Sequence, residues 1–62
     1  MKLIGQQDRY LHTWLADKAS EVTADFGQQS AIGSMIIVIE TKDIFIKNNE
    51  GKWQKFGTNE VI

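Results

Sequence analysis

Acid–base chemistry in this chain would depend on His12, its one histidine, which stands between Asp8 and Asp17 in the sequence. A histidine acts as a general base when it lies within hydrogen-bond reach of a nucleophile or a second titratable group. No nucleophile or second base accompanies His12 in the sequence pattern, so we interpret it as a solvated side chain. The sequence therefore predicts no catalytic residue and no enzyme.

A row of carboxylates, Asp17, Glu21 and Asp25, repeats every four residues and could line one face of a helix. A calcium loop instead needs closely alternating oxygen ligands on a bent backbone. There is no cysteine and only one histidine, which excludes the usual zinc arrangements. The glycines are isolated and none opens a helix, so no phosphate-binding loop is expected. We predict no metal and no cofactor.

Four large aromatic side chains could recognise a ligand or a partner: Tyr10, Trp14, Trp53 and Phe56. Exposed rings of this kind stack on sugars or anchor protein interfaces. Buried, they are the largest pieces of a small core. We favour the core or a subunit interface over a ligand site.

These side chains must be positioned by one small α+β domain, residues 1–62. The expected order is an extended arm over 1–7, an amphipathic helix over 8–24, a three-stranded antiparallel β-meander over 34–56 and a tail over 57–62. Asp8 is a plausible N-cap of the helix. The i, i+3/i+4 spacing predicts helix–sheet packing by Leu11, Trp14, Leu15 and Val22.

The β-meander is expected from strands at 34–40, 44–47 and 52–56, with turns at 41–43 and 48–51. The first strand is unbroken in its apolar residues, which indicates that both of its faces are covered. A three-residue first turn would place Ile36, Val38, Ile44 and Ile46 on one face, and Met35, Ile37, Ile39 and Phe45 on the other.

One helix can cover only one of these two apolar faces. An exposed patch of several hundred Å² is rare in soluble monomers, so the second face predicts a partner, most simply copies of the same chain in a closed ring. The alternative is that the arm and tail fold over this face through Leu3, Ile4, Val61 and Ile62. The residues expected at the interface are Ile37, Ile39, Phe45 and Trp53.

Length and charge agree with assembly. A 62-residue chain buries a marginal core and usually needs disulfides, a metal or a partner. The formal net charge of −1 does not indicate a nucleic-acid partner. No apolar run approaches the roughly 20 residues of a membrane span, and MKLIGQQD has no signal-peptide core. We therefore expect synthesis in a cytoplasm, without membrane contact.

The C-terminal half resembles a β-module of small tailed-phage virion proteins, among them head-fibre, head-decoration and tail-associated chains. The resemblance spans 33–56: Gly-Ser, an apolar strand, Glu-Thr-Lys-Asp-Ile-Phe, an Asn turn with Gly51, and Lys52-Trp53. Two positions depart from the pattern, because Lys42 replaces its turn glycine and Phe45 replaces its tyrosine. The residues of 8–24 match no motif of that module.

The resemblance implies a non-catalytic structural component of a virion, a homo-oligomer that binds a larger capsid or tail protein through its sheet. A first alternative is a small phage-encoded inhibitor of a host protein, which predicts clustered acidic residues opposite a patch-free sheet. A second is a carbohydrate-contacting module, which needs at least two of Tyr10, Trp14 and Trp53 coplanar and exposed.

Overall fold

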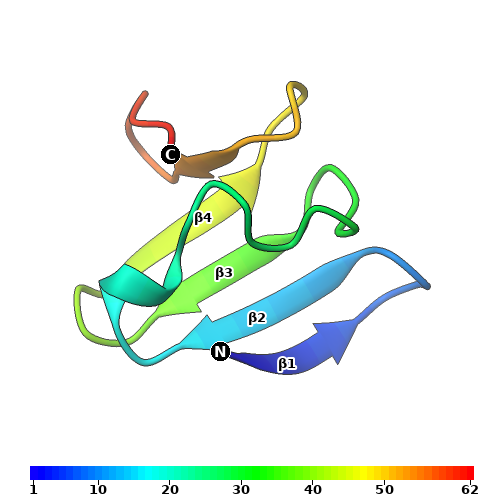
Figure 1. The fold of residues 1–62 in the computed structure, drawn as a ribbon, viewed down its shortest axis with the longest axis horizontal. Coiled ribbons are helices and arrows are strands. Elements are labelled where there is room, and N and C mark those ends of the chain that lie inside the picture. Colours follow the sequence, from blue (N-terminus) through cyan, green and yellow to red (C-terminus); the bar gives the residue numbers. More distant parts are fainter.

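The computed structural model describes residues 1–62, and its five strands form one sheet with the spatial order β1-β2-β3-β4-β5 (Figure 1). All neighbouring strands are antiparallel except β2 and β3, which are parallel. The only helical element is a short 3₁₀ turn, η1, at Ala19–Glu21. The strands are β1 (Lys2–Gln6), β2 (His12–Ala16), β3 (Met35–Val38), β4 (Asp43–Lys47) and β5 (Trp53–Lys55).

The helix expected over 8–24 is wrong, because His12–Ala16 is a strand at the middle of this segment. Threonine, histidine and tryptophan are weak helix formers, and β2 gains a hydrogen-bonded neighbour on each side. The fold is therefore all-β with a mixed sheet, not α+β. The four residues expected to pack a helix on the sheet, Leu11, Trp14, Leu15 and Val22, share no helical stripe.

Asp8 makes the hydrogen bonds of an N-cap without a helix. Its carboxylate oxygen accepts the backbone N–H groups of Tyr10 (2.8 Å) and Leu11 (3.0 Å), which closes the turn between β1 and β2. These two bonds, the first being the stronger influence, hold the pKa of Asp8 below its ordinary value. An aspartate that accepts nearby backbone N–H groups can begin a helix or close a hairpin turn, and here it closes a turn. The prediction of a helix N-cap at Asp8 was therefore wrong.

Residues 35–55 form three consecutive antiparallel strands, but these are three of five rather than the whole sheet. Their first turn has four residues, 39–42, and not three, since Val38 pairs with Asp43. Lys42 provides the left-handed conformation of this turn, with a φ of 60°. The pairing differs by an odd number of residues from the expected one, so Phe45 stands beside Ile36 and faces the core.

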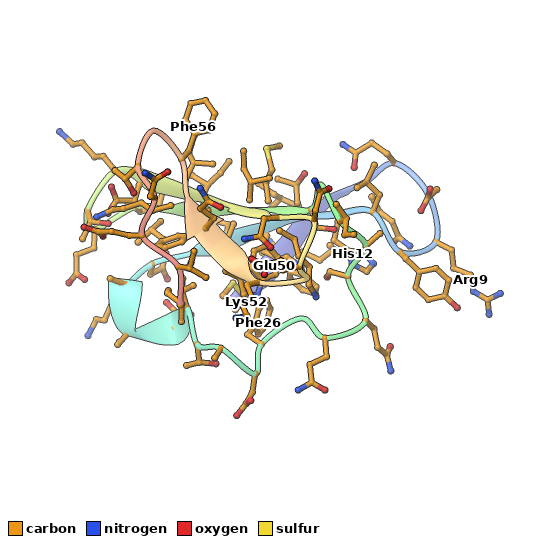
Figure 2. The ribbon with its side chains drawn as sticks, turned by 90° about the horizontal axis from the view of Figure 1, so that it is seen from above. Arg9, His12, Phe26, Glu50, Lys52 and Phe56 are labelled. Carbon is orange, nitrogen blue, oxygen red and sulfur yellow. The ribbon has the colours of Figure 1, made fainter.

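The core lies between the sheet and the crossover segment, residues 17–34, which links the parallel strands β2 and β3. Viewed along the sheet, this segment and η1 lie on one side only (Figure 2). Trp14, Ala19 and Phe26 pack at the margin of a group of buried residues: Ala16, Val22, Ile36, Val38, Phe45 and Trp53.

Aromatic rings join the crossover segment to the sheet. The Phe26 ring meets Trp14 edge-on, with centroids 5.0 Å apart, and lies 6.4 Å from Trp53. The indole N–H of Trp53 donates to the Phe26 carbonyl at 2.7 Å. Trp53 thereby contributes both apolar contact and a hydrogen bond to the segment that covers the core.

Gly27 is required by its conformation and by its neighbour. Its φ is +67°, and an added Cβ would lie 2.9 Å from a ring carbon of Trp53. We expect Gly27→Ala to cost about 2–5 kcal/mol of unfolding free energy, from backbone strain plus overpacking. Gly51 has a φ of +76° and open space around it, so Gly51→Ala should cost only about 1–2 kcal/mol. Equal losses in denaturant unfolding would contradict the close approach to Trp53.

Lys47 is a buried cation, 6% exposed, whose ammonium donates to the Gly27 carbonyl and lies 5.4 Å from the Trp53 ring centroid. Burial lowers its pKa below the ordinary value of 10.5.

Between the lowered pKa of Lys47 and 10.5 the unfolded chain binds more protons than the folded one, so the free energy of unfolding rises with pH. We expect the free energy of unfolding, measured with urea, to rise over this alkaline range in the wild type and not in Lys47→Met. The same rise in both proteins would contradict its assignment to Lys47.

Candidate functional site

The face of the sheet that the crossover segment leaves uncovered is apolar across most of its width. The register places Leu15, Ile37 and Ile44 side by side on β2, β3 and β4, and Met35 beside Ile46 in the next row. The Phe56 amide bonds to the Ile44 carbonyl, which brings Phe56 alongside this row. We call this surface the open face: Leu15, Met35, Ile37, Ile39, Ile44, Ile46 and Phe56.

The open face is exposed to solvent at three of its residues, Ile39, Ile44 and Phe56. Ile44 is 37% exposed and Phe56 is 68% exposed. Figure 2 shows the Phe56 ring pointing away from the sheet, on the side opposite to Phe26 and the crossover segment. Leu15, Met35, Ile37 and Ile46 are half-buried between the exposed residues, so the seven side chains form one partly solvent-exposed apolar surface on a single face of the domain.

Neither chain end covers this surface. The expected arm is the edge strand β1, paired with β2. The tail returns to the other edge, where Val61 pairs with Gln54 of β5. Figure 1 shows the two termini at opposite edges of the sheet. The alternative in which Leu3, Ile4, Val61 and Ile62 cover the second face therefore does not describe this structure.

A hollow of about 180 Å³ opens beside Phe56, between the Ile46 end of β4 and the turn after β5. Its volume is below the roughly 300–1,000 Å³ of small-molecule sites, so it suits a single side chain. Gln54 is one of its lining residues, and its side-chain oxygen accepts the Asn48 side-chain N–H at 3.2 Å. The open face thus carries a protruding aromatic ring next to a recess.

The structure separates the four residues expected at the interface. Ile37 and Ile39 lie on the open face, whereas Phe45 and Trp53 are buried on the opposite face. The longer first turn is the reason, because it moves Phe45 into line with Ile36. The other open-face residues were not among the four expected at the interface, because the Val38–Asp43 pairing that sets the register has no signal in the sequence. They are Leu15, Met35, Ile44, Ile46 and Phe56.

A second hollow lies on the covered face, between β2 and the loop at residues 25–30. It has a volume of about 500 Å³ and is lined by His12, Trp14 and the loop. His12 is not a freely solvated side chain as the sequence suggested: its Nδ1 lies 2.8 Å from the Ser30 hydroxyl, which also accepts the Trp14 indole N–H at 3.2 Å. We call this hollow the β2 cleft.

The row of carboxylates does not converge. The Glu21 carboxylate pairs with the N-terminal ammonium and accepts the Lys18 amide, contacts that lower its pKa in that order. Asp25 lies instead at the β2 cleft. No group of three or more histidine or acidic side chains is placed to hold a metal ion.

The other two aromatic candidates, Tyr10 and Trp53, lie in different environments. Tyr10 is exposed in the turn after β1, with the Arg9 guanidinium 5.7 Å from its ring centroid. Trp53 is only 1% exposed. The carbohydrate-contacting alternative required at least two of Tyr10, Trp14 and Trp53 coplanar and exposed, and this condition is not met: of the three rings only Trp14 borders the β2 cleft.

These features define a small all-β domain with one open apolar face. Comparison with protein families, with curated proteins and with solved structures finds no match to the chain. No helix in the structure has the length and apolar character needed to span a membrane.

Proposed function

We propose that this protein is a non-catalytic assembly component, which associates with copies of itself through the open face and attaches to a larger protein. The resemblance over 33–56 favours an accessory role in a phage particle, with a capsid or tail protein as the larger partner. The single observation that carries the proposal is the apolar surface that extends from β2 to the residue after β5 with nothing over it.

The dimensions of the molecule limit the interface that this face can form. The two longer dimensions are 28 and 23 Å, so a contact over the whole face covers at most roughly 640 Å², below the about 800 Å² per partner of a standard interface. Association costs about 4–15 kcal/mol in lost freedom. A single isoleucine contributes about 1.5–3 kcal/mol when fully buried, so a stable complex requires most of the open face.

The shape of the surface favours a second copy as the occupant. Phe56 protrudes beside a recess of about 180 Å³ on the same face. In a symmetric pair, the Phe56 ring of each copy can enter the recess of the other, which is the self-complementary arrangement that two-fold interfaces require. Copies of the chain thus supply the cover that its own ends do not.

The inhibitor alternative required a patch-free sheet opposite clustered acidic residues. The open face does not meet that condition, and Glu21 is already engaged by the N-terminal ammonium. No specific observation favours that function over assembly.

The proposal is tested by measuring the molar mass in solution, with light scattering on a size-exclusion column over a range of protein concentrations. We expect a discrete multimer, at a whole-number multiple of the chain mass that holds as the protein is diluted. A strict monomer at every concentration would overturn self-association.

A further inference from the structure

The β2 cleft has the volume and the walls of a small-molecule site, on the face that assembly does not use. Its volume of about 500 Å³ falls within the roughly 300–1,000 Å³ of ligand pockets. Two of its lining side chains come from β2 and the rest from the loop at 25–30. A rigid sheet thus supplies one wall and a turn-rich loop supplies the other.

The aromatic wall is fixed in place. The Trp14 ring is held edge-on by Phe26 at 5.0 Å and lies 5.4 Å from the His12 ring. Its indole N–H is anchored to the hydroxyl of Ser30, which is 5% exposed. A ligand that stacks on Trp14 would therefore meet a preorganised surface, which reduces the ordering cost of binding.

The hydrogen bonds at Ser30 bear on what His12 offers. The Ser30 oxygen accepts the Trp14 N–H, and we assign to His12 the neutral tautomer in which the Ser30 hydroxyl donates to Nδ1. In the neutral imidazole the remaining proton is then on Nε2, which bonds to no group of the chain. No buried side-chain nitrogen or oxygen lacks a partner, so this Nε2–H is open to solvent at the cleft.

The remaining polar groups complement that donor. Asp25 brings a carboxylate acceptor, and Gln28 and Gln29 each bring an amide that both donates and accepts. Asp25 is the only acidic residue of the lining, and no lysine or arginine lines the cleft to balance a phosphate or a carboxylate. Anionic ligands are therefore disfavoured, and groups that both donate and accept are favoured.

We propose that the β2 cleft binds a neutral saccharide in a different mode from the two-ring platform, with the apolar C–H face of one sugar ring on Trp14 alone and its hydroxyls on His12, Asp25 and the two glutamines. A sugar hydroxyl accepts from Nε2 of His12 and donates to Asp25 at once, which matches the alternation of these groups. A saccharide is also the ligand class that combines one apolar ring face with a neutral, hydroxyl-rich edge.

The test is a titration of ¹⁵N-labelled protein with maltose, cellobiose, lactose and N,N′-diacetylchitobiose, read by NMR. The reporters are the Trp14 indole N–H and the side-chain amides of Gln28 and Gln29. About a dozen sugar atoms in contact correspond to a Kd of about 1 mM. We expect saturable shifts of these reporters with at least one sugar, and roughly tenfold weaker binding in Asp25→Ala.

The matched control is Asp17→Ala, which removes an exposed carboxylate outside the cleft and should leave the sugar affinity unchanged. Three results would overturn the assignment: no shift with any of the four sugars, equal loss of affinity in both variants, or shifts of the reporters with tetramethylammonium in place of sugars. Ile44→Asp on the open face should keep the sugar shifts, so failure of assembly and failure of saccharide binding are distinguishable.

Discussion

Trp53→Ala is expected to leave the chain unfolded at 25 °C. Trp53 is the largest buried side chain, and it holds the crossover segment through Phe26 and the sheet through Lys47. Truncation of a buried tryptophan costs about 3–5 kcal/mol, and a core of this size rarely supplies more than about 3–5 kcal/mol in total. The measurement is far-UV circular dichroism with amide dispersion by NMR.

Trp53→Phe is the matched control. It keeps a ring in the core but removes the indole N–H that donates to Phe26, which leaves that part-buried carbonyl without this partner. We expect a loss of about 1–3 kcal/mol and a folded protein. A dispersed, wild-type-like spectrum from Trp53→Ala would mean that Trp53 does not hold the crossover segment on the sheet.

Ile44→Asp is expected to dissociate the assembly without unfolding the monomer. Ile44 is 37% exposed in the single chain and stands at the middle of the open face, between Ile37 and Phe56. The substitution removes about 1.5–3 kcal/mol of burial per copy and places an unpaired carboxylate in the interface. The dissociation constant should rise by at least about a hundredfold, as measured by sedimentation or light scattering.

The control for this effect is Ile32→Asp. Ile32 is also exposed, at 55%, but it lies at the end of the crossover segment and outside the open face. The same change of side chain there should leave the oligomer intact. If the two variants dissociate alike, or neither does, the interface is not the open face.

The sequence predicted the strands of 35–55 better than the elements before them. The apolar, β-branched residues around Ile36 have no competing pattern, whereas 8–24 carries signals of two kinds. Leu11, Trp14 and Leu15 have helical spacing, but Trp14 and Ala16 also alternate inward from a strand. Tertiary pairing decided the outcome, because β2 pairs with β1 over 12–15 and with β3 over 13–16.

The choice of interface residues depended on one turn. Two apolar faces follow from composition, but which residues share a face depends on whether the turn before β4 has three or four residues. Lys42, in a left-handed conformation, ends a four-residue turn and sends Phe45 to the core and Ile44 to the surface. A lysine gives no local indication of that conformation, so the register was not predictable from sequence.

The β2 cleft could not be predicted at all. Ser30 and His12 are far apart in the sequence, and only the parallel pairing of β2 with β3 folds the intervening segment back over Trp14. With a helix expected over 8–24, His12 pointed to solvent and Ser30 had no role. A polar site between a strand and a loop of this kind depends on topology rather than on a motif.

The most direct test of the open face as an interface is methyl NMR of isoleucine-labelled protein with a soluble gadolinium chelate. Ile36 is buried in the core and Ile32 is exposed outside the open face. The methyl group of Ile36 therefore gives the lower limit of paramagnetic relaxation by the chelate, and that of Ile32 gives the upper limit. In the assembly we predict that Ile37 and Ile44 are protected almost as well as Ile36, and that Ile32 is relaxed strongly. Relaxation of Ile44 equal to that of Ile32, at the same protein concentration, would show that the open face is not covered and would contradict the account.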